Sequence, residues 1–208
     1  MIRVALTMRV AEDPAHGERR DSISHDWLSL LRHWEMTPLP VPNIGIDAGR
    51  WLRDQKPDLV VLTGGGDPAQ PTERAATERT LLDHASEARI PVLGVCRGLQ
   101  YINLFYGGAL CDIDGHVATP HPVSIEPIWH GHYGARATVN SYHDLGIRDA
   151  ELGDGLIAAA RDDDGNIEAA CHADLPLAAI MWHPERTGAL DGDKTLVEAL
   201  LANAGSAT

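Results

Sequence analysis

The sequence has few cysteines and no long hydrophobic run. Its 208 residues contain three cysteines, Cys96, Cys111 and Cys171, with no C-x-x-C spacing between them. An odd number without such spacing argues against a disulfide framework or a zinc knuckle and favours a reducing cytoplasm. No apolar stretch approaches the roughly 20 residues of a membrane span. The start "MIRVALTMRV" lacks the small-residue cleavage site of a signal peptide, so we expect no membrane partner.

Positive charge is also scarce. The chain has 17 Lys and Arg against 30 Asp and Glu, a formal net charge of −13. Such a chain repels phosphate backbones, so we expect no nucleic-acid partner. Hydrophobic residues make up 44% of the chain, enough to build a core, which excludes a disordered protein. A globular protein with a small-molecule substrate is the expected class.

Apolar patterning in the first half predicts strands that alternate with helices. The first expected helix has a candidate N-cap at Ser22 or Ser24, and the second has one at Thr72. The polar segment 11–21 contains Pro and Gly and is expected to form a loop. Alternation of this kind implies a parallel sheet covered by helices on both faces. The expected strands are 2–6, 58–63 and 90–96, the extended segment is 38–43, and the helices are 23–34, 72–89 and 97–106.

The second half has a different character. Residues 109–142 form short segments rich in His, Pro and Gly. Segment 156–173 is typical of two strands around an Asp-Gly turn, and a buried strand and a closing helix follow at 176–182 and 193–204. We find no internal repeat or linker, so one domain is expected over residues 1–208.

The stretch "GVCRGLQ" (94–100) joins a buried strand to a helix through Cys96 with almost no loop. This is the pattern of a nucleophile elbow, with Cys in place of Ser and with Gly94 and Gly98 as the small neighbours. A helix N-terminus favours a thiolate, and the N–H of Arg97 would point at an oxyanion. The alternative is a core thiol, because free cysteines are commonly buried. Cys111 and Cys171 lack this pattern and are expected to be structural.

A thiol nucleophile needs a base, and "AAIMWHPE" (178–185) offers one. His183 follows a buried strand, so it emerges at the same sheet edge as Cys96. Glu185 lies two residues further on, and Pro184 stiffens the link, so the carboxylate can orient the imidazole. The alternative is a histidine that only caps backbone groups at the strand end.

The histidine-rich middle of the chain raises the question of a metal. His116, His121, His130 and His132 lie there, but no Cys or carboxylate cluster completes a site in the sequence. We therefore expect no metal and no cofactor.

Several motifs together resemble a known family. "GVCRGLQ" with "WHPE" resembles the class I glutamine amidotransferase superfamily, and "VVLTGGGD" (60–67) resembles its oxyanion strand. "VNSYHDLGI" (139–147) and "DGNIEAA" (164–170) resemble its γ-glutamyl hydrolase branch, which is peptidase C26-like. The resemblance implies a flavodoxin-like three-layer α/β fold with a mainly parallel central sheet, a cysteine nucleophile elbow and a small antiparallel addition.

The resemblance also implies roles for individual residues. Cys96 would attack the δ-carbonyl of a γ-glutamyl group and form a thioester, His183 would carry the proton to the leaving amine, and Glu185 would hold the imidazole. Backbone N–H groups of Arg97 and of Gly65 or Gly66 would bind the oxyanion. The substrate-binding residues implied are Gln100, Ser141 and His143.

The same resemblance favours a hydrolase that releases glutamate and an amine from a small γ-glutamyl amide. Stretch 7–27 resembles a bacterial group that hydrolyses γ-glutamyl-CDP-amidate in the phosphoramidate decoration of surface polysaccharide. Arg19 and Arg20 would then meet phosphates, unless they are ordinary surface arginines of a solvated loop.

Two other functions stay open. The chain could be a glutaminase subunit that supplies ammonia to a separate synthetase, or a non-catalytic regulatory or binding protein of the same fold. The intact Cys96, His183 and Glu185 argue against the second. The sequence leaves open whether the protein is a monomer or a homodimer.

Overall fold

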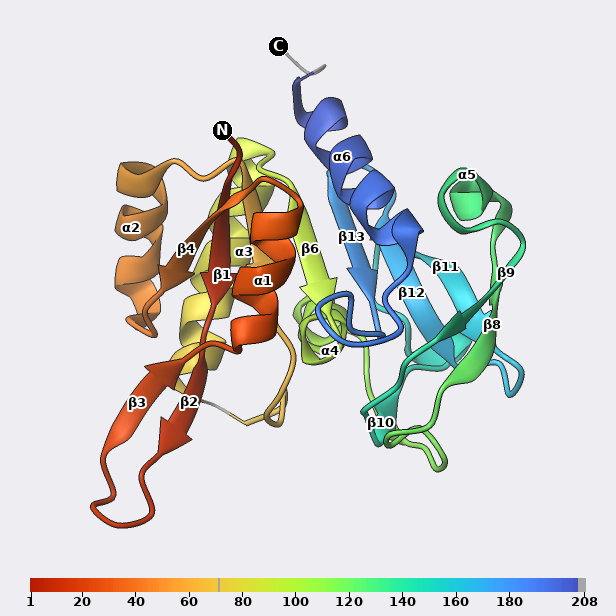
Figure 1. The fold of residues 1–208 in the computed structure, drawn as a ribbon, viewed down its shortest axis with the longest axis horizontal. Helices are drawn as coiled ribbons and strands as arrows, with labels where there is room; N and C mark the ends of the chain where they lie inside the picture. Colours follow the sequence, from red (N-terminus) through yellow and green to blue (C-terminus); the bar gives the residue numbers. More distant parts are fainter. Residues whose placement is uncertain (71, 206–208) are drawn as a thin grey trace.

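A nine-stranded β-sheet runs through the protein in a computed structural model that describes residues 1–70 and 72–205 (Figure 1). The strand order is β4-β1-β5-β6-β13-β12-β11-β8-β9. The strands of this sheet are β1 (Arg3–Thr7), β4 (Thr37–Val41), β5 (Leu59–Leu62), β6 (Val92–Val95), β8 (His121–Ile125), β9 (Arg136–Val139), β11 (Leu156–Asp162), β12 (Ile167–His172) and β13 (Leu177–Ile180).

The first five strands of this order pair in parallel. Helices α1 (His25–His33) and α6 (Asp191–Gly205) cover one face, and Figure 1 shows both in front of the sheet. Helices α2 (Ala48–Gln55), α3 (Glu73–Ala88) and α4 (Arg97–Phe105) pack on the other face. The prediction of a parallel sheet between two helical layers is confirmed.

Strand side chains alternate between two hydrophobic cores. In β1, Val4 and Leu6 belong to the core under α1 and α6, whereas Ala5 belongs to the core under α2, α3 and α4. Residues of β5 alternate in the same way, with Val61 on the first side and Val60 on the second. Side chains of a strand point alternately to its two faces, so a fully apolar run fills both cores at once.

The antiparallel addition that was expected is also present. Strands β13, β12, β11, β8 and β9 pair antiparallel to one another within the main sheet. The predicted Asp-Gly hairpin is present as β11 and β12, with Gly165 at φ +84° in the turn. A short ribbon of β7 (Cys111–Asp112) and β10 (Leu145–Gly146) adds a second antiparallel pair.

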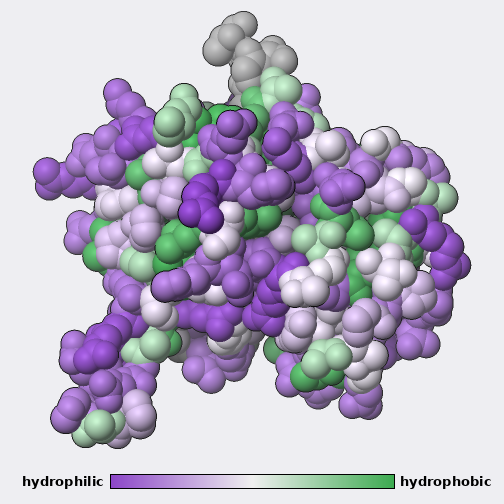
Figure 2. All heavy atoms as spheres, in the orientation of Figure 1, coloured by the Kyte–Doolittle hydropathy of each residue, from purple (hydrophilic) through white to green (hydrophobic). Residues whose placement is uncertain are grey.

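The segment expected as a loop at 11–21 is instead part of a β-hairpin. Strands β2 (Arg9–Glu12) and β3 (Arg19–Ser22) pair antiparallel and project from the body of the protein (Figure 1). The projecting hairpin has a largely hydrophilic surface in Figure 2. Its residues are mostly exposed, so no apolar periodicity marks the two strands.

Short local signals predicted some elements and not others. Ser24 caps α1 by accepting a hydrogen bond from the N–H of Asp26, and Thr72 caps α3 through the N–H of Ala75, as expected. Helix α2 was not predicted; its eight residues bury Ala48 and Leu52, and it ends at a left-handed Lys56. The described residues also include short 3-10 turns at Gly45–Asp47, Pro127–Trp129 and Asp149–Glu151.

No helix among the described residues is both long enough and apolar enough to cross a membrane. One domain over residues 1–208 stays a prediction, and its last three residues, 206–208, lie outside the described part.

Candidate active site

Cys96 occupies a strained turn between β6 and α4. Its backbone has φ 52° and ψ −107°, a conformation that costs a non-glycine residue on the order of 1–3 kcal/mol. Its N–H is held by the carbonyl of Ile180 on the neighbouring strand, 2.8 Å away. The strand, the turn and the helix thus have the arrangement of a nucleophile elbow.

The two glycines of the turn let α4 pack directly against the sheet. A Cβ at Gly98 would lie 2.2 Å from the carbonyl oxygen of Leu62 on β5. A Cβ at Gly94 would lie 2.9 Å from the carbonyl carbon of Gly98. Both positions therefore exclude any side chain for steric reasons, in agreement with the small neighbours that the turn was expected to need.

Burial of the Cys96 thiol opposes the thiolate that was expected at the helix N-terminus. Burial raises the pKa of the Cys96 thiol to about 11, and the hydrogen bond from the N–H of Arg97 opposes this shift only in part. Desolvation of the charged form therefore outweighs the helix N-terminus here. A base must accept the proton when the sulfur reacts.

His183 and Glu185 form a hydrogen-bonded pair at the same place. The Nδ1 atom of His183 lies 2.8 Å from Oε1 of Glu185. The carboxylate can only accept, so Nδ1 carries the proton and Nε2 offers a lone pair in the neutral ring. This Nε2 is buried and has no hydrogen-bond partner among the described residues.

Gly64 places Cys96 and His183 close together. A Cβ built on Gly64 would lie 2.7 Å from Cε1 of His183 and 3.4 Å from Cβ of Cys96. The two side chains therefore approach the same point from different strands. This arrangement can transfer a proton from a thiol to an imidazole.

Asn140 fixes the loop that carries His183, and it was not among the predicted site residues. Its Oδ1 accepts from the N–H of His183 at 2.8 Å, and its Nδ2 donates to the carbonyl of His183 at 2.9 Å. The same Nδ2 also donates to the carbonyl of Thr187 at 3.2 Å. Asn140 lies inside "VNSYHDLGI", so its segment was singled out but the residue was not.

A cavity of about 550 Å³ opens beside Cys96 and His183. It brings together most of the residues expected at the site and adds two arginines, Arg9 and Arg186, that were not predicted from the sequence. The only sequence feature that could have pointed to Arg9 is its position just after the first strand, because β1 ends at Thr7. The expected residues that line the cavity with Cys96 and His183 are Gly65, Gly66, Arg97, Gln100 and His143.

Three of the expected substrate-binding residues are placed differently. Ser141 does not line the cavity: its buried hydroxyl donates to the carbonyl of His116 at 2.6 Å, so a substrate role does not fit this structure. Arg19 lines an adjoining cavity of about 210 Å³ that shares Arg9, Gly65 and Gly66 with the first, and it is paired with Glu73. Arg20 lines neither cavity and pairs with Glu18 and Asp13.

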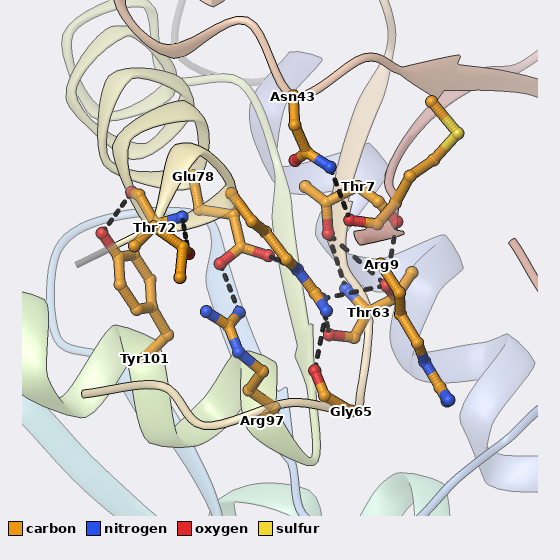
Figure 3. Close-up of polar contacts among 12 residues, drawn as sticks. Thr7, Arg9, Asn43, Thr63, Gly65, Thr72, Glu78, Arg97 and Tyr101 are labelled. Carbon is orange, nitrogen blue, oxygen red and sulfur yellow. Dashed lines mark hydrogen bonds and ion pairs between the residues drawn. The ribbon is translucent and has the colours of Figure 1, made fainter. Parts of the chain in front are cut away.

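A buried ionic network holds the glycine loop (Figure 3). Glu78 pairs with Arg97 and, at 2.8 Å, with Arg74. Arg74 then donates to the carbonyls of Gly65 and Thr63, and Arg9 donates to the carbonyl of Gly64. In a trans peptide the N–H points opposite to the carbonyl, so these contacts turn the N–H groups of Gly65 and Gly66 away from the arginines.

The expectation of no metal rested on the lack of a carboxylate near the histidines, but the fold brings one there. Ligand atoms of His116, His121 and Glu168 all lie within 4.8 Å of one another. His130 and His132 lie apart, with their ring nitrogens near the carbonyl of Ile125 and the hydroxyl of Thr195. Glu168 is about 50 residues away in the chain, so the sequence carried no local sign of it.

Known proteins resemble this chain in sequence. Residues 3–185 match the model of the Peptidase C26 family. The glutamine amidotransferase-like protein YvdE of Lactococcus lactis is 35% identical over 160 residues, 62% of this chain and 66% of that protein. The γ-glutamyl-CDP-amidate hydrolase of Campylobacter jejuni is 28% identical over 204 residues, 94% of this chain and 96% of that protein.

A solved structure supports the fold. A Thermoplasma acidophilum protein described as a GMP synthase subunit superposes with a TM-score of 0.74 at 20% identity, covering 99% of this chain and 95% of that one. The family match spans nearly the whole chain, including both the cysteine elbow and the histidine–glutamate loop. The chain therefore belongs to the Peptidase C26 family and is a glutamine amidotransferase-like amidohydrolase, an enzyme that cleaves C–N bonds with a cysteine.

Proposed function

We propose that this enzyme hydrolyses the γ-glutamyl amide bond of a small molecule through a thioester on Cys96. The observation that carries the proposal is the meeting of Cys96 and the His183–Glu185 pair across Gly64, at the wall of the 550 Å³ cavity. A nucleophile, a base and a carboxylate that orients the base are the parts that cysteine amidohydrolysis needs.

The reaction proceeds in two halves. Nε2 of His183 accepts the thiol proton as the Cys96 sulfur attacks the δ-carbonyl, and a C–S bond forms. The tetrahedral intermediate collapses with cleavage of the C–N bond, and the imidazolium gives its proton to the leaving amine. His183 then deprotonates a water that attacks the thioester, which releases glutamate and restores the thiol. Glu185 stabilises the imidazolium in both halves.

The negative charge of each tetrahedral intermediate needs donors that are already in place. We assign this role to the N–H of Arg97 at the start of α4 and the N–H groups of Gly65 and Gly66. Arg74 and Arg9 support this assignment because they hold the loop carbonyls on the other side. Fixed donors need no reorganisation when the charge develops.

The glutamyl part of the substrate is expected to lie against Gln100 and His143. Gln100 donates from Nε2 to the carbonyl of Leu145 at 2.9 Å, which leaves its Oε1 as an acceptor at the cavity. Nδ1 of His143 lies 3.1 Å from the same carbonyl. Both side chains are thereby held in one orientation.

We further propose a substrate with an anionic amine half, such as a γ-glutamyl-CDP-amidate. Two observations support it. The adjoining cavity is lined by Arg9, Arg19, Arg74 and Arg97, and arginine is well suited to phosphate. The Campylobacter jejuni relative, which matches nearly end to end, hydrolyses γ-glutamyl-CDP-amidate by its name.

Replacing the nucleophile tests the proposed reaction. Cys96→Ala is expected to lower turnover of every γ-glutamyl amide by about 10⁴-fold or more, because removal of a nucleophile leaves only binding and the oxyanion donors. Cys171→Ala, which alters a half-buried cysteine outside the active cavity, should keep wild-type turnover. Steady-state glutamate release measures both, and circular dichroism checks that each variant is folded. Wild-type turnover by Cys96→Ala would remove Cys96 from the mechanism.

The pH dependence of alkylation tests the state of the resting thiol. Because a thiol pKa of about 11 leaves only traces of thiolate near neutrality, the iodoacetamide rate at Cys96 should rise about tenfold per pH unit from 7 to 9. The rate is measured without substrate, by peptide mass mapping, with Cys111 and Cys171 as internal references. A plateau below pH 8 would show instead that Cys96 rests as a thiolate beside an imidazolium.

The two neighbouring arginines of β3 form a matched pair for the substrate test. Arg19→Ala should raise KM about three- to tenfold for a substrate whose amine half carries phosphate, because Arg19 lines the adjoining cavity and is half exposed. The same variant should leave KM for glutamine unchanged, and Arg20→Ala should leave both unchanged. Equal KM values for Arg19→Ala and wild type on γ-glutamyl-CDP-amidate would reject a phosphate contact at Arg19 and leave the amide hydrolysis untouched.

A further inference from the structure

A second group of ionisable side chains, the histidine cluster, consists of His116, His121, His143 and Glu168. Glu168 is 1% exposed, His143 4% and His116 6%, and His121 is half-buried. The residues come from four separate places in the chain: the loop after β7, the start of β8, the segment between β9 and β10, and β12. Nothing in the proposed hydrolysis uses Glu168, His116 or His121.

Each imidazole of the histidine cluster has its Nδ1 at a backbone carbonyl. His116 faces the carbonyl of Asp114 at 3.0 Å, His121 that of Pro122 at 3.3 Å, and His143 that of Leu145 at 3.1 Å. A carbonyl only accepts, so each Nδ1 carries a proton and each neutral ring has its lone pair on Nε2. This is the tautomer in which a metal-binding histidine is held by its outer partner.

The three Nε2 atoms converge on the carboxylate of Glu168. Their distances to its oxygens are 3.6 Å from His143, 3.8 Å from His121 and 3.9 Å from His116. None of these five atoms has a hydrogen-bond partner among the described residues. Burying a charged carboxylate without a hydrogen-bond donor destabilises the folded protein, and the lone pairs of three Nε2 atoms pointed at that carboxylate destabilise it further. The cluster therefore needs positive charge at its centre.

Distance decides between a proton and a metal ion. Separations of 3.6–3.9 Å are too long for hydrogen bonds, since a polar contact of about 3.6 Å no longer counts as one. Ligand atoms around a tetrahedral zinc ion, with bonds of about 2.0–2.1 Å, lie about 3.3 Å apart, so these separations would shorten when an ion binds. His143 is not among the residues whose ligand atoms all lie within 4.8 Å of one another, so it would have to move toward the other two histidines. His116 also lies 3.0 Å from Asp162, but without hydrogen-bond geometry.

Asp162 is already committed to its own turn. Its Oδ1 accepts from the N–H groups of Asp164 and Asn166, and its Oδ2 accepts from Nδ2 of Asn166 at 2.7 Å. Asp162 is itself a carboxylate, so it cannot neutralise Glu168, and its Oδ2 faces the same Nε2 of His116 that would bind a metal ion.

We propose that the histidine cluster is a binding site for a divalent transition-metal ion of the zinc class, with His116, His121 and Glu168 as ligands and His143 closing the fourth position. Three imidazoles and a carboxylate are a donor set that suits zinc. The ion would join β8 and β12 to the segment that carries Tyr142, His143 and Leu145 at the wall of the active cavity. Its role would be to hold that wall, since the ligands leave no open coordination position for a substrate.

Metal affinity tests the proposal independently of hydrolysis. The full chain, purified without an affinity tag of histidines and stripped with a chelator, is titrated with Zn²⁺ against a chromophoric competitor. One tight site per chain is expected in the wild type. His121→Ala, the change at the most accessible ligand, should weaken Zn²⁺ binding by about 100-fold or more. His130→Ala and His132→Ala, matched histidines outside the cluster, should bind as the wild type does.

A second measurement on the unaltered protein covers the case of an unfolded variant. Co²⁺ bound in place of Zn²⁺ should give the intense visible absorption of a four-coordinate site, and equimolar Zn²⁺ should abolish it. The proposal would be overturned if folded His121→Ala bound Zn²⁺ as tightly as the wild type does, or if Co²⁺ gave the weak spectrum of a six-coordinate site. Neither result would bear on the thioester at Cys96.

Discussion

The close approach of Cys96 and His183 across Gly64 is the constraint on which the rest of the site depends. There is no room for a side chain at Gly64, since a Cβ there would lie 2.7 Å from the imidazole. The loop must therefore be held by its backbone, and two arginines, the buried Arg74 and the exposed Arg9, bind its carbonyls. Cys96 keeps its strained backbone because β13 on one side and α4 on the other fix both ends of the turn. Proposed nucleophile, base and oxyanion donors thus rest on three neighbouring parallel strands.

Two opposing effects act on the sulfur, and burial is the stronger. The N–H of Arg97 at the start of α4 favours the thiolate, but desolvation favours the thiol and raises its pKa to about 11. A raised thiol pKa makes the proposed nucleophile dependent on the proposed base His183, whose Nε2 is free to accept while Nδ1 is held by Glu185. Asn140 forms hydrogen bonds with both the N–H and the carbonyl of His183, so the proposed base is positioned through its main chain as well as its side chain.

Features that depend on residues close together in the sequence could be predicted, whereas features that depend on contacts between distant residues could not. The elbow, the histidine–glutamate loop and the Asp-Gly hairpin are encoded within a few residues, and each lies where expected. Arg9 and Asn140 act on partners 55 and 43 residues away, which no local pattern reveals. The β2–β3 hairpin differs from the predicted loop because exposed strands carry no apolar alternation. The sequence places Glu168 in a hairpin, and only the antiparallel half of the sheet brings it among the histidines.

The central claim is that hydrolysis passes through a glutamyl thioester on Cys96. Acid quenching of the enzyme during turnover of a γ-glutamyl amide, followed by mass mapping of the peptides, tests it most directly. We expect a mass increase of one glutamyl group on the peptide that contains Cys96, which hydroxylamine removes. Accumulation of the glutamyl group on a residue other than Cys96 would contradict it.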